Sequence, residues 1–96
     1  MGAPDLIRLD PRDTVAVCRT AIAAGTQLRL GDGNLTALDS VPQGHKIALA
    51  VHAAGDQVVK YGHPIGVATA PIAVGDHVHV HNLATVRGRR QTVGAP

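Results

Sequence analysis

The sequence predicts a small all-β domain, and three observations support this fold class. The chain has 96 residues, which is the size of one domain. Glycine and proline recur too often for long helices, and the runs between them are short and rich in β-formers. The core has no Phe or Trp and only one Tyr, Tyr61. Burial must therefore come from Val, Ile, Leu and Ala, which suit closely packed, short strands.

The β-rich runs between the turn residues define the expected elements. Asp10 and Asp13, on either side of Pro11, are typical turn formers that introduce the first strand. Residues 32–34 indicate a loop tip, and a brief helical turn is expected around residues 39–41. The expected strands are 14–18, 27–30, 46–50, 57–60, 65–69 and 77–83.

A short internal repeat supports the same fold class. Four segments begin with an apolar residue, or with His52, followed by two small or turn residues, a glycine, two polar residues and an apolar residue. The glycine suits a turn conformation that other residues resist. The irregular spacing indicates a recurring corner and not a solenoid, and His52 is expected to be an ordinary histidine near a turn. The segments are 22–28, 41–47, 52–58 and 72–78.

Composition argues against several functional classes. The net charge is only +2, and base-stacking aromatic residues are almost absent, so no nucleic-acid partner is expected. The basic run of residues 87–90 is expected to be a solvated tail or a partner contact.

Cys18 is the only cysteine, which excludes an internal disulfide, favours a cytoplasmic protein and indicates a small buried residue. Without a signal peptide or a bilayer-length apolar segment, no membrane partner is expected.

The most informative segment for chemistry is 75–83, which contains three alternating histidines. On a strand, His77, His79 and His81 would share one face. Imidazole nitrogens at this spacing can coordinate one transition metal, and we predict His79 and His81 as metal ligands. The alternative is a half-buried strand whose polar face happens to carry histidine.

Two turns offer further candidate side chains. His45 and Lys46 follow a turn glycine, where the lysine could hold a carboxylate and the histidine could act as acid, base or ligand. Lys60 and Tyr61 crowd a second turn, in which Gly62 permits close approach of a ligand or another backbone. Solvated turn residues, or a tyrosine that caps the core, are the alternatives.

Together these segments resemble the N-terminal SAF-type domain of the altronate/galactarate dehydratase family. The matching segments are Val41–Leu49, Val59–Gly66 and Gly75–Leu83, in the same order and at similar spacing, within a resemblance that runs from Ile7 to Leu83. The resemblance implies a small β-clip fold, SAF-like and similar to type III antifreeze domains, over residues 7–84. Residues 1–6 are then expected to be a flexible N-terminus, and residues 85–96 a basic, flexible C-terminal tail or linker.

The resemblance also implies a function in sugar-acid metabolism. We expect an accessory domain or small subunit of a sugar-acid dehydratase that is inactive without a large catalytic domain or subunit. A divalent metal of the iron or manganese type is expected in the assembled enzyme. The open alternatives are a sulfolactate-type lyase subunit, a non-catalytic carbohydrate-binding β-clip module and a structural assembly domain. The expected site residues are His45, Lys46, Lys60 and Tyr61 for catalysis, Gly62 and Asn82 for substrate binding, and His79 and His81 for metal binding.

Overall fold

The domain consists of short antiparallel strands joined by tight turns. The computed structural model describes residues 6–31 and 33–85, and no helix occurs among them, which confirms the expected all-β class. No helix in this part of the chain could therefore span a membrane. The strands are β1 (Leu6–Ile7), β2 (Val15–Cys18), β3 (Gln27–Leu30), β4 (Gly33–Thr36), β5 (Lys46–Ala48), β6 (Gln57–Lys60), β7 (His63–Ala68), β8 (His77–Val78) and β9 (Leu83–Thr85).

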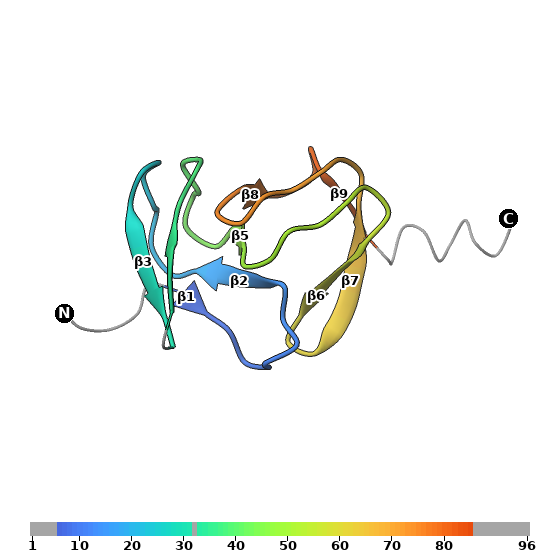
Figure 1. Ribbon diagram of the computed structural model, residues 1–96, viewed down its shortest axis with the longest axis horizontal. Coiled ribbons are helices and arrows are strands. Elements are labelled where there is room, and N and C mark those ends of the chain that lie inside the picture. The colour runs from blue at the N-terminus through green and yellow to red at the C-terminus, as the bar shows by residue number, and fades with distance from the viewer. Residues whose placement is uncertain (1–5, 32, 86–96) are drawn as a thin grey trace, which may run out of the picture.

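The strands form three antiparallel sheets. A four-stranded sheet of order β1-β2-β5-β8 lies at the centre of the molecule. The β3–β4 hairpin lies on one side of this sheet and the three-stranded sheet β6-β7-β9 lies on the other (Figure 1). The central sheet therefore lies between the β3–β4 hairpin and the β6-β7-β9 sheet and packs against both.

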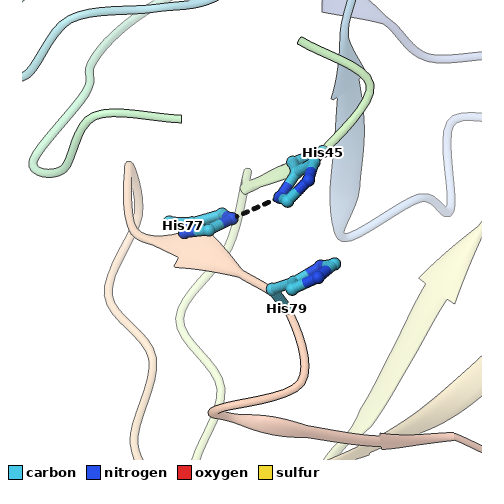
Figure 2. A group of neighbouring side chains, drawn as sticks. All are labelled: His45, His77 and His79. Atoms are coloured by element: carbon cyan, nitrogen blue, oxygen red, sulfur yellow. Dashed lines mark hydrogen bonds between the residues drawn. The ribbon is translucent and has the colours of Figure 1, made fainter. Parts of the chain in front are cut away.

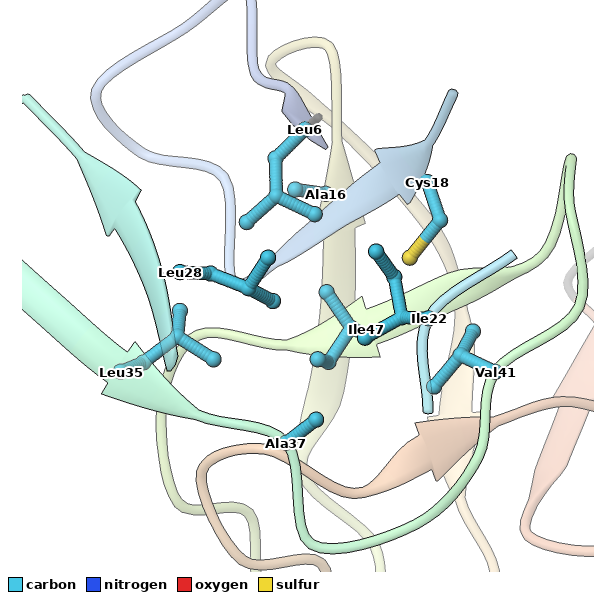
Figure 3. Packing of buried hydrophobic residues seen from close by; sticks show 9 residues of the cluster. All are labelled: Leu6, Ala16, Cys18, Ile22, Leu28, Leu35, Ala37, Val41 and Ile47. Carbon is cyan, nitrogen blue, oxygen red and sulfur yellow. The ribbon is translucent and has the colours of Figure 1, made fainter. Parts of the chain in front are cut away.

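Two small hydrophobic cores occupy the two sides of the central sheet. Neighbouring residues of β2 and β5 contribute to different cores, as expected from the alternation of side chains along a strand. Figure 3 shows the first core, in which a leucine from each strand of the β3–β4 hairpin meets Ile47 of β5. The first core contains Leu6, Ala16, Cys18, Ile22, Leu28, Leu35, Ala37, Val41 and Ile47. The second contains Val15, Ala48, Val58, Ala68, Ile72, Val78 and Leu83.

The predicted repeat is a real structural unit. The glycine of each segment has a positive φ: 89° at Gly25, 83° at Gly44, 94° at Gly55 and 93° at Gly75. These are conformations that residues with a Cβ resist. The residues that open the segments pair with one another, Ile22 with Val41 and His52 with Ile72.

The second half of the domain repeats the backbone hydrogen bonds of the first half. In the first half, the Gly25 and Gly44 amides donate to the carbonyls of Ala37 and Cys18, at 2.7 and 2.8 Å. In the second half, the Gly55 and Gly75 amides donate to those of Ala68 and Ala48, at 2.7 and 2.9 Å. Strand β5 closes the first half and opens the second.

The prediction of one continuous strand over residues 77–83 is wrong, because residues 79–82 are not in a strand. Strand β8 ends at Val78 and β9 begins at Leu83. The chain turns between them, and the backbone amide of Asn82 donates to the backbone carbonyl of His79 at 3.0 Å. The alternation of His77, His79 and His81 therefore does not follow a continuous strand.

Two other expectations need correction, and two lie mostly or wholly outside the described residues. Strand β4 begins at Gly33, where a loop tip was expected. Residues 39–41 form a bend and a β-bridge in place of the expected helical turn. The proposed N-terminal segment, apart from Leu6, and the basic run 87–90 lie outside the described residues.

Candidate functional site

Three histidines meet where β5 begins and β8 ends. The antiparallel register pairs Lys46 with Val78 and Ile47 with His77. Continuing this register by one residue places His45 opposite His79. Side chains of directly opposed residues lie on the same face of a sheet. Strand pairing therefore brings His45 to the two histidines of the 75–83 segment, as Figure 2 shows.

The three imidazole rings are in close contact. His45 Nδ1 and His77 Nε2 are 2.9 Å apart and hydrogen-bonded. The His45 and His79 rings stack with their centroids 4.1 Å apart, and the His77 and His79 centroids are 5.6 Å apart. One ring nitrogen from each histidine lies within 4.8 Å of the other two. All three side chains are partly buried.

Asn82 fixes the backbone that carries two of these histidines. Its Oδ1 accepts the His79 amide hydrogen and its Nδ2 donates to the His77 carbonyl, both at 2.9 Å. Asn82 is 8% exposed, so water competes little for these bonds. The Asn82 amide group, which we expected to bind substrate, is engaged in holding this turn together.

The surroundings of the cluster lower the pKa of two of its histidines and of the adjoining Lys46. Partial burial lowers the pKa of His77, and nearby positive charge, first that of His45, lowers it further. The pKa of His79 is lowered by desolvation and then by His45. Burial and the charge of Lys60 lower the pKa of Lys46, which adjoins His45. A neutral imidazole keeps one nitrogen lone pair free to accept a proton or bind a cation.

His81 lies beside the cluster, outside the group of three. It is exposed on the turn that follows β8, and its ring centroid is 5.3 Å from that of His77. His79, the other half of the predicted metal pair, belongs to the group. The structure thus brings together His45, His77 and His79, and the predicted pairing of His79 with His81 stays a prediction.

The second predicted turn connects β6 to β7. Tyr61 and Gly62 both have positive φ, 56° and 80°, the pattern of a two-residue type I′ hairpin. Lys60 Nζ lies 5.0 Å from the centroid of the Tyr61 ring, a cation–π contact. A Cβ on Gly62 would lie 2.7 Å from Asp10 Oδ2, so the close approach at this glycine is made by the chain's own loop. The charge of Lys60 helps to lower the pKa of Lys46, the residue that follows His45 in the chain.

Two buried polar residues were not recognised as important from the sequence. Asp13 is 5% exposed, and its Oδ1 accepts the Gly62 amide hydrogen at 2.7 Å. His52, expected to be an ordinary histidine near a turn, is 2% exposed and contacts Thr14 Oγ1 through Nε2 at 2.8 Å. For His52 the sequence signal was its place in the repeat, where the other three segments have Ile or Val.

Fold and site together define a small antiparallel β domain with a cluster of three partly buried imidazoles. The chain belongs to the altronate/galactarate dehydratase SAF domain family, whose family model matches residues 4–86.

Named relatives agree with this assignment. The chain is 44% identical over 79 residues to an altronate dehydratase of Escherichia coli and 38% identical over 79 residues to that of Bacillus subtilis. Each match covers 82% of this chain and 16% of the relative. The chain is also 48% identical over 56 residues to the alpha subunit of a (2R)-sulfolactate sulfo-lyase of Paracoccus pantotrophus, covering 58% of this chain and 84% of that subunit.

Proposed function

We propose that this chain is the accessory domain or small subunit of a hydro-lyase that dehydrates sugar acids of the altronate or galactarate type. The observation that supports this most strongly is the match to two altronate dehydratases over only 16% of their length. Most of the catalytic machinery of such an enzyme then lies in a larger unit. The present chain contributes a surface to that unit.

The chemistry of dehydration supports a contributing role for the histidine cluster. Loss of water from a sugar acid requires a base for the proton beside the carboxylate, stabilisation of the developing enolate and help for the departing hydroxyl. The cluster offers imidazoles as proton acceptors, two of them with a lowered pKa, and Lys46, which adjoins His45 in the chain, can attract a carboxylate. A carboxylate pair of the kind that could share this work is not part of the cluster as far as the described residues show. We therefore place these side chains at the edge of a site completed by the larger unit.

A sulfolactate-type lyase is the second candidate, and one observation favours it. The matched sulfo-lyase relative is itself a subunit, and the alignment covers 84% of it. That is the arrangement expected if the present chain is a separate small subunit. The reaction would then expel sulfite in place of water, with the same need for a base near the substrate carboxylate.

Co-expression with the large family chain of the same genome tests the proposed function. We expect the two chains to co-elute in size-exclusion chromatography and to dehydrate altronate or galactarate only together. Assays with sulfolactate separate the two candidates. Full activity of the large chain alone, without association, would contradict an accessory role.

A pair of lysine and arginine substitutions tests the part played by the cluster surface. Lys46→Ala should lower the rate of the assembled enzyme by about 100-fold, a usual effect of losing a positioned catalytic group. Arg29→Ala, on the exposed face of β3, should leave the rate unchanged. Equal rates for both variants would remove Lys46 from the site.

A further inference from the structure

We propose that His45, His77 and His79 form a binding site for a divalent transition-metal ion, with a coordination position left open. The site is built on this chain alone and does not depend on the proposed lyase function. It differs from the predicted pair of His79 and His81, because it includes a ligand from β5 and leaves His81 out.

The spacing of the ring nitrogens supports a single ion. Zinc-type ions bind imidazole nitrogen at ~2.0–2.1 Å in tetrahedral geometry, which requires about 3.4 Å between ligand atoms. In the cluster, one nitrogen of each ring lies within 4.8 Å of the others, and the His45–His77 pair is already at 2.9 Å. The rings are only partly buried and lie at strand ends, and the stacked His45 and His79 rings would rotate about their side-chain bonds to direct their nitrogens at one ion.

The backbone holds the three ligands in place before an ion arrives. Asn82 joins the backbone of His77 to that of His79. The β5–β8 register fixes His45 against both of them, and the His45 carbonyl accepts the Cys18 amide hydrogen at 2.8 Å. Such preorganisation lowers the entropy cost of assembling a site.

The ligand chemistry selects the class of ion. A set made of imidazoles alone suits borderline ions such as Zn²⁺, Co²⁺ or Fe²⁺, whereas Mg²⁺ and Ca²⁺ prefer oxygen. Three protein ligands around a tetrahedral ion leave the fourth position to water or to another molecule. Within the described part of the chain, the rings themselves share one hydrogen bond, between His45 and His77, so His79 has ligand capacity to spare.

Titration of the purified full chain with Co²⁺, followed by visible absorption, tests the site. We expect saturable binding of a single ion, with the intense bands of four-coordinate Co²⁺ and displacement by Zn²⁺. The changes His45→Ala, His77→Ala and His79→Ala should each weaken Co²⁺ binding by at least about 100-fold, because even the loss of a supporting partner costs ~10–100-fold. Melting temperatures identify folded variants, and His77→Gln replaces His77→Ala if the latter does not fold.

Two other histidines provide the controls. His63→Ala removes an exposed histidine of β7 and should leave Co²⁺ affinity unchanged. His81→Ala should have little effect if the ligands are the three proposed here, whereas a loss equal to that of His79→Ala would favour the pair predicted from sequence and overturn our ligand set. A wild-type spectrum that remains that of hydrated Co²⁺ would overturn the site itself. Neither result depends on whether the large chain restores lyase activity.

Discussion

At the scale of single residues, Asp13 shows how a buried carboxylate connects distant segments. Its Oδ2 accepts the Leu9 and Asp10 amide hydrogens at 3.3 Å, and its Oδ1 accepts that of Gly62. Burial alone would raise the pKa of Asp13, but the backbone donors, Gly62 first among them, outweigh it and lower the pKa. The charged carboxylate therefore holds the loop before β2 against the tip of the β6–β7 hairpin.

We expect Asp13→Asn to lower the free energy of unfolding at pH 7 by about 1–2 kcal/mol, because an amide offers one acceptor where the carboxylate has two. A lowered folded pKa adds stability above the unfolded value, about 3.9, and this stability is lost as pH falls through the folded value. The wild type should thus lose part of its stability below about pH 4, and the variant should lack that part of the decline. Melting curves between pH 7 and pH 3 measure both effects.

Asp56→Asn is the matched control for Asp13. Asp56 also accepts a backbone hydrogen bond, from the Ala53 amide at 2.7 Å, but it lies exposed. Its substitution should cost much less stability. Equal melting temperatures for the Asp13 variant and the wild type would show that the link between loop and hairpin does not stabilise the fold.

At the scale of elements, the repeated glycine turns differ in what surrounds them. Gly25 and Gly75 have nearly the same φ, 89° and 93°. A Cβ on Gly25 would meet open space, whereas a Cβ on Gly75 would overlap the Thr36 carbonyl oxygen. The Gly75 carbonyl also accepts the Leu38 amide hydrogen at 2.9 Å. Both turns hydrogen-bond to the end of the β3–β4 hairpin, but only the glycine before β8 is packed against it on the side where a Cβ would lie.

This difference predicts unequal effects of the same substitution. Gly25→Ala should cost about 1–2 kcal/mol, the price of a left-handed backbone with a Cβ. Gly75→Ala carries the same conformational cost and adds a backbone clash, so we expect a clearly larger loss of unfolding free energy. Urea denaturation of both variants measures the difference. Equal losses would mean that the contact at Thr36 relaxes without cost.

The elements also show what the sequence could and could not predict. Residues 27–30 and 57–60 were predicted as strands and are β3 and β6, because turn residues bound them clearly. The strand after Gly75 was predicted too long, since its histidine–valine alternation cannot reveal that Asn82 captures the backbone of His77 and His79. Strand β4 was missed altogether because Gly33 and Asn34 favour turns, and only pairing with β3 makes this segment a strand.

The same limit applies to the candidate site. His79 could be singled out from spacing along the chain alone. The place of His45 beside it depends on the antiparallel pairing of β5 with β8, which no periodicity within either segment specifies. Sequence therefore predicted the residue types of the site and only part of their grouping.

At the scale of the whole molecule, the two halves share a hydrogen-bonding plan but differ at one buried position. Ile22 opens the first half and packs in the first core. His52 occupies the equivalent place in the second half, 2% exposed. Its Nδ1 has no hydrogen-bond partner among the described residues. An unpaired polar atom in a core carries a desolvation cost.

We expect His52→Ile to raise the free energy of unfolding by about 1 kcal/mol, because the unpaired nitrogen is replaced by a group that suits the core. Thr14 Oγ1 loses its contact with His52 but still accepts the Val59 amide hydrogen at 3.0 Å. The reciprocal change, Ile22→His, should destabilise the domain by about 2 kcal/mol or more. Thermal unfolding of the two variants compares them, and a less stable His52→Ile variant would show that the histidine is needed where it lies.

The sharing of β5 by the two halves determines how the domain can come apart. Ile47 of this strand packs in the first core and Ala48 in the second, while its backbone pairs with β2 on one edge and β8 on the other. Within residues 6–31 and 33–85, separating the two halves would therefore remove β5 from one of its cores and from one of its partner strands. Amide hydrogens of the two hairpins should then exchange with solvent at a common rate set by opening of the entire domain, as expected for a single cooperative unit.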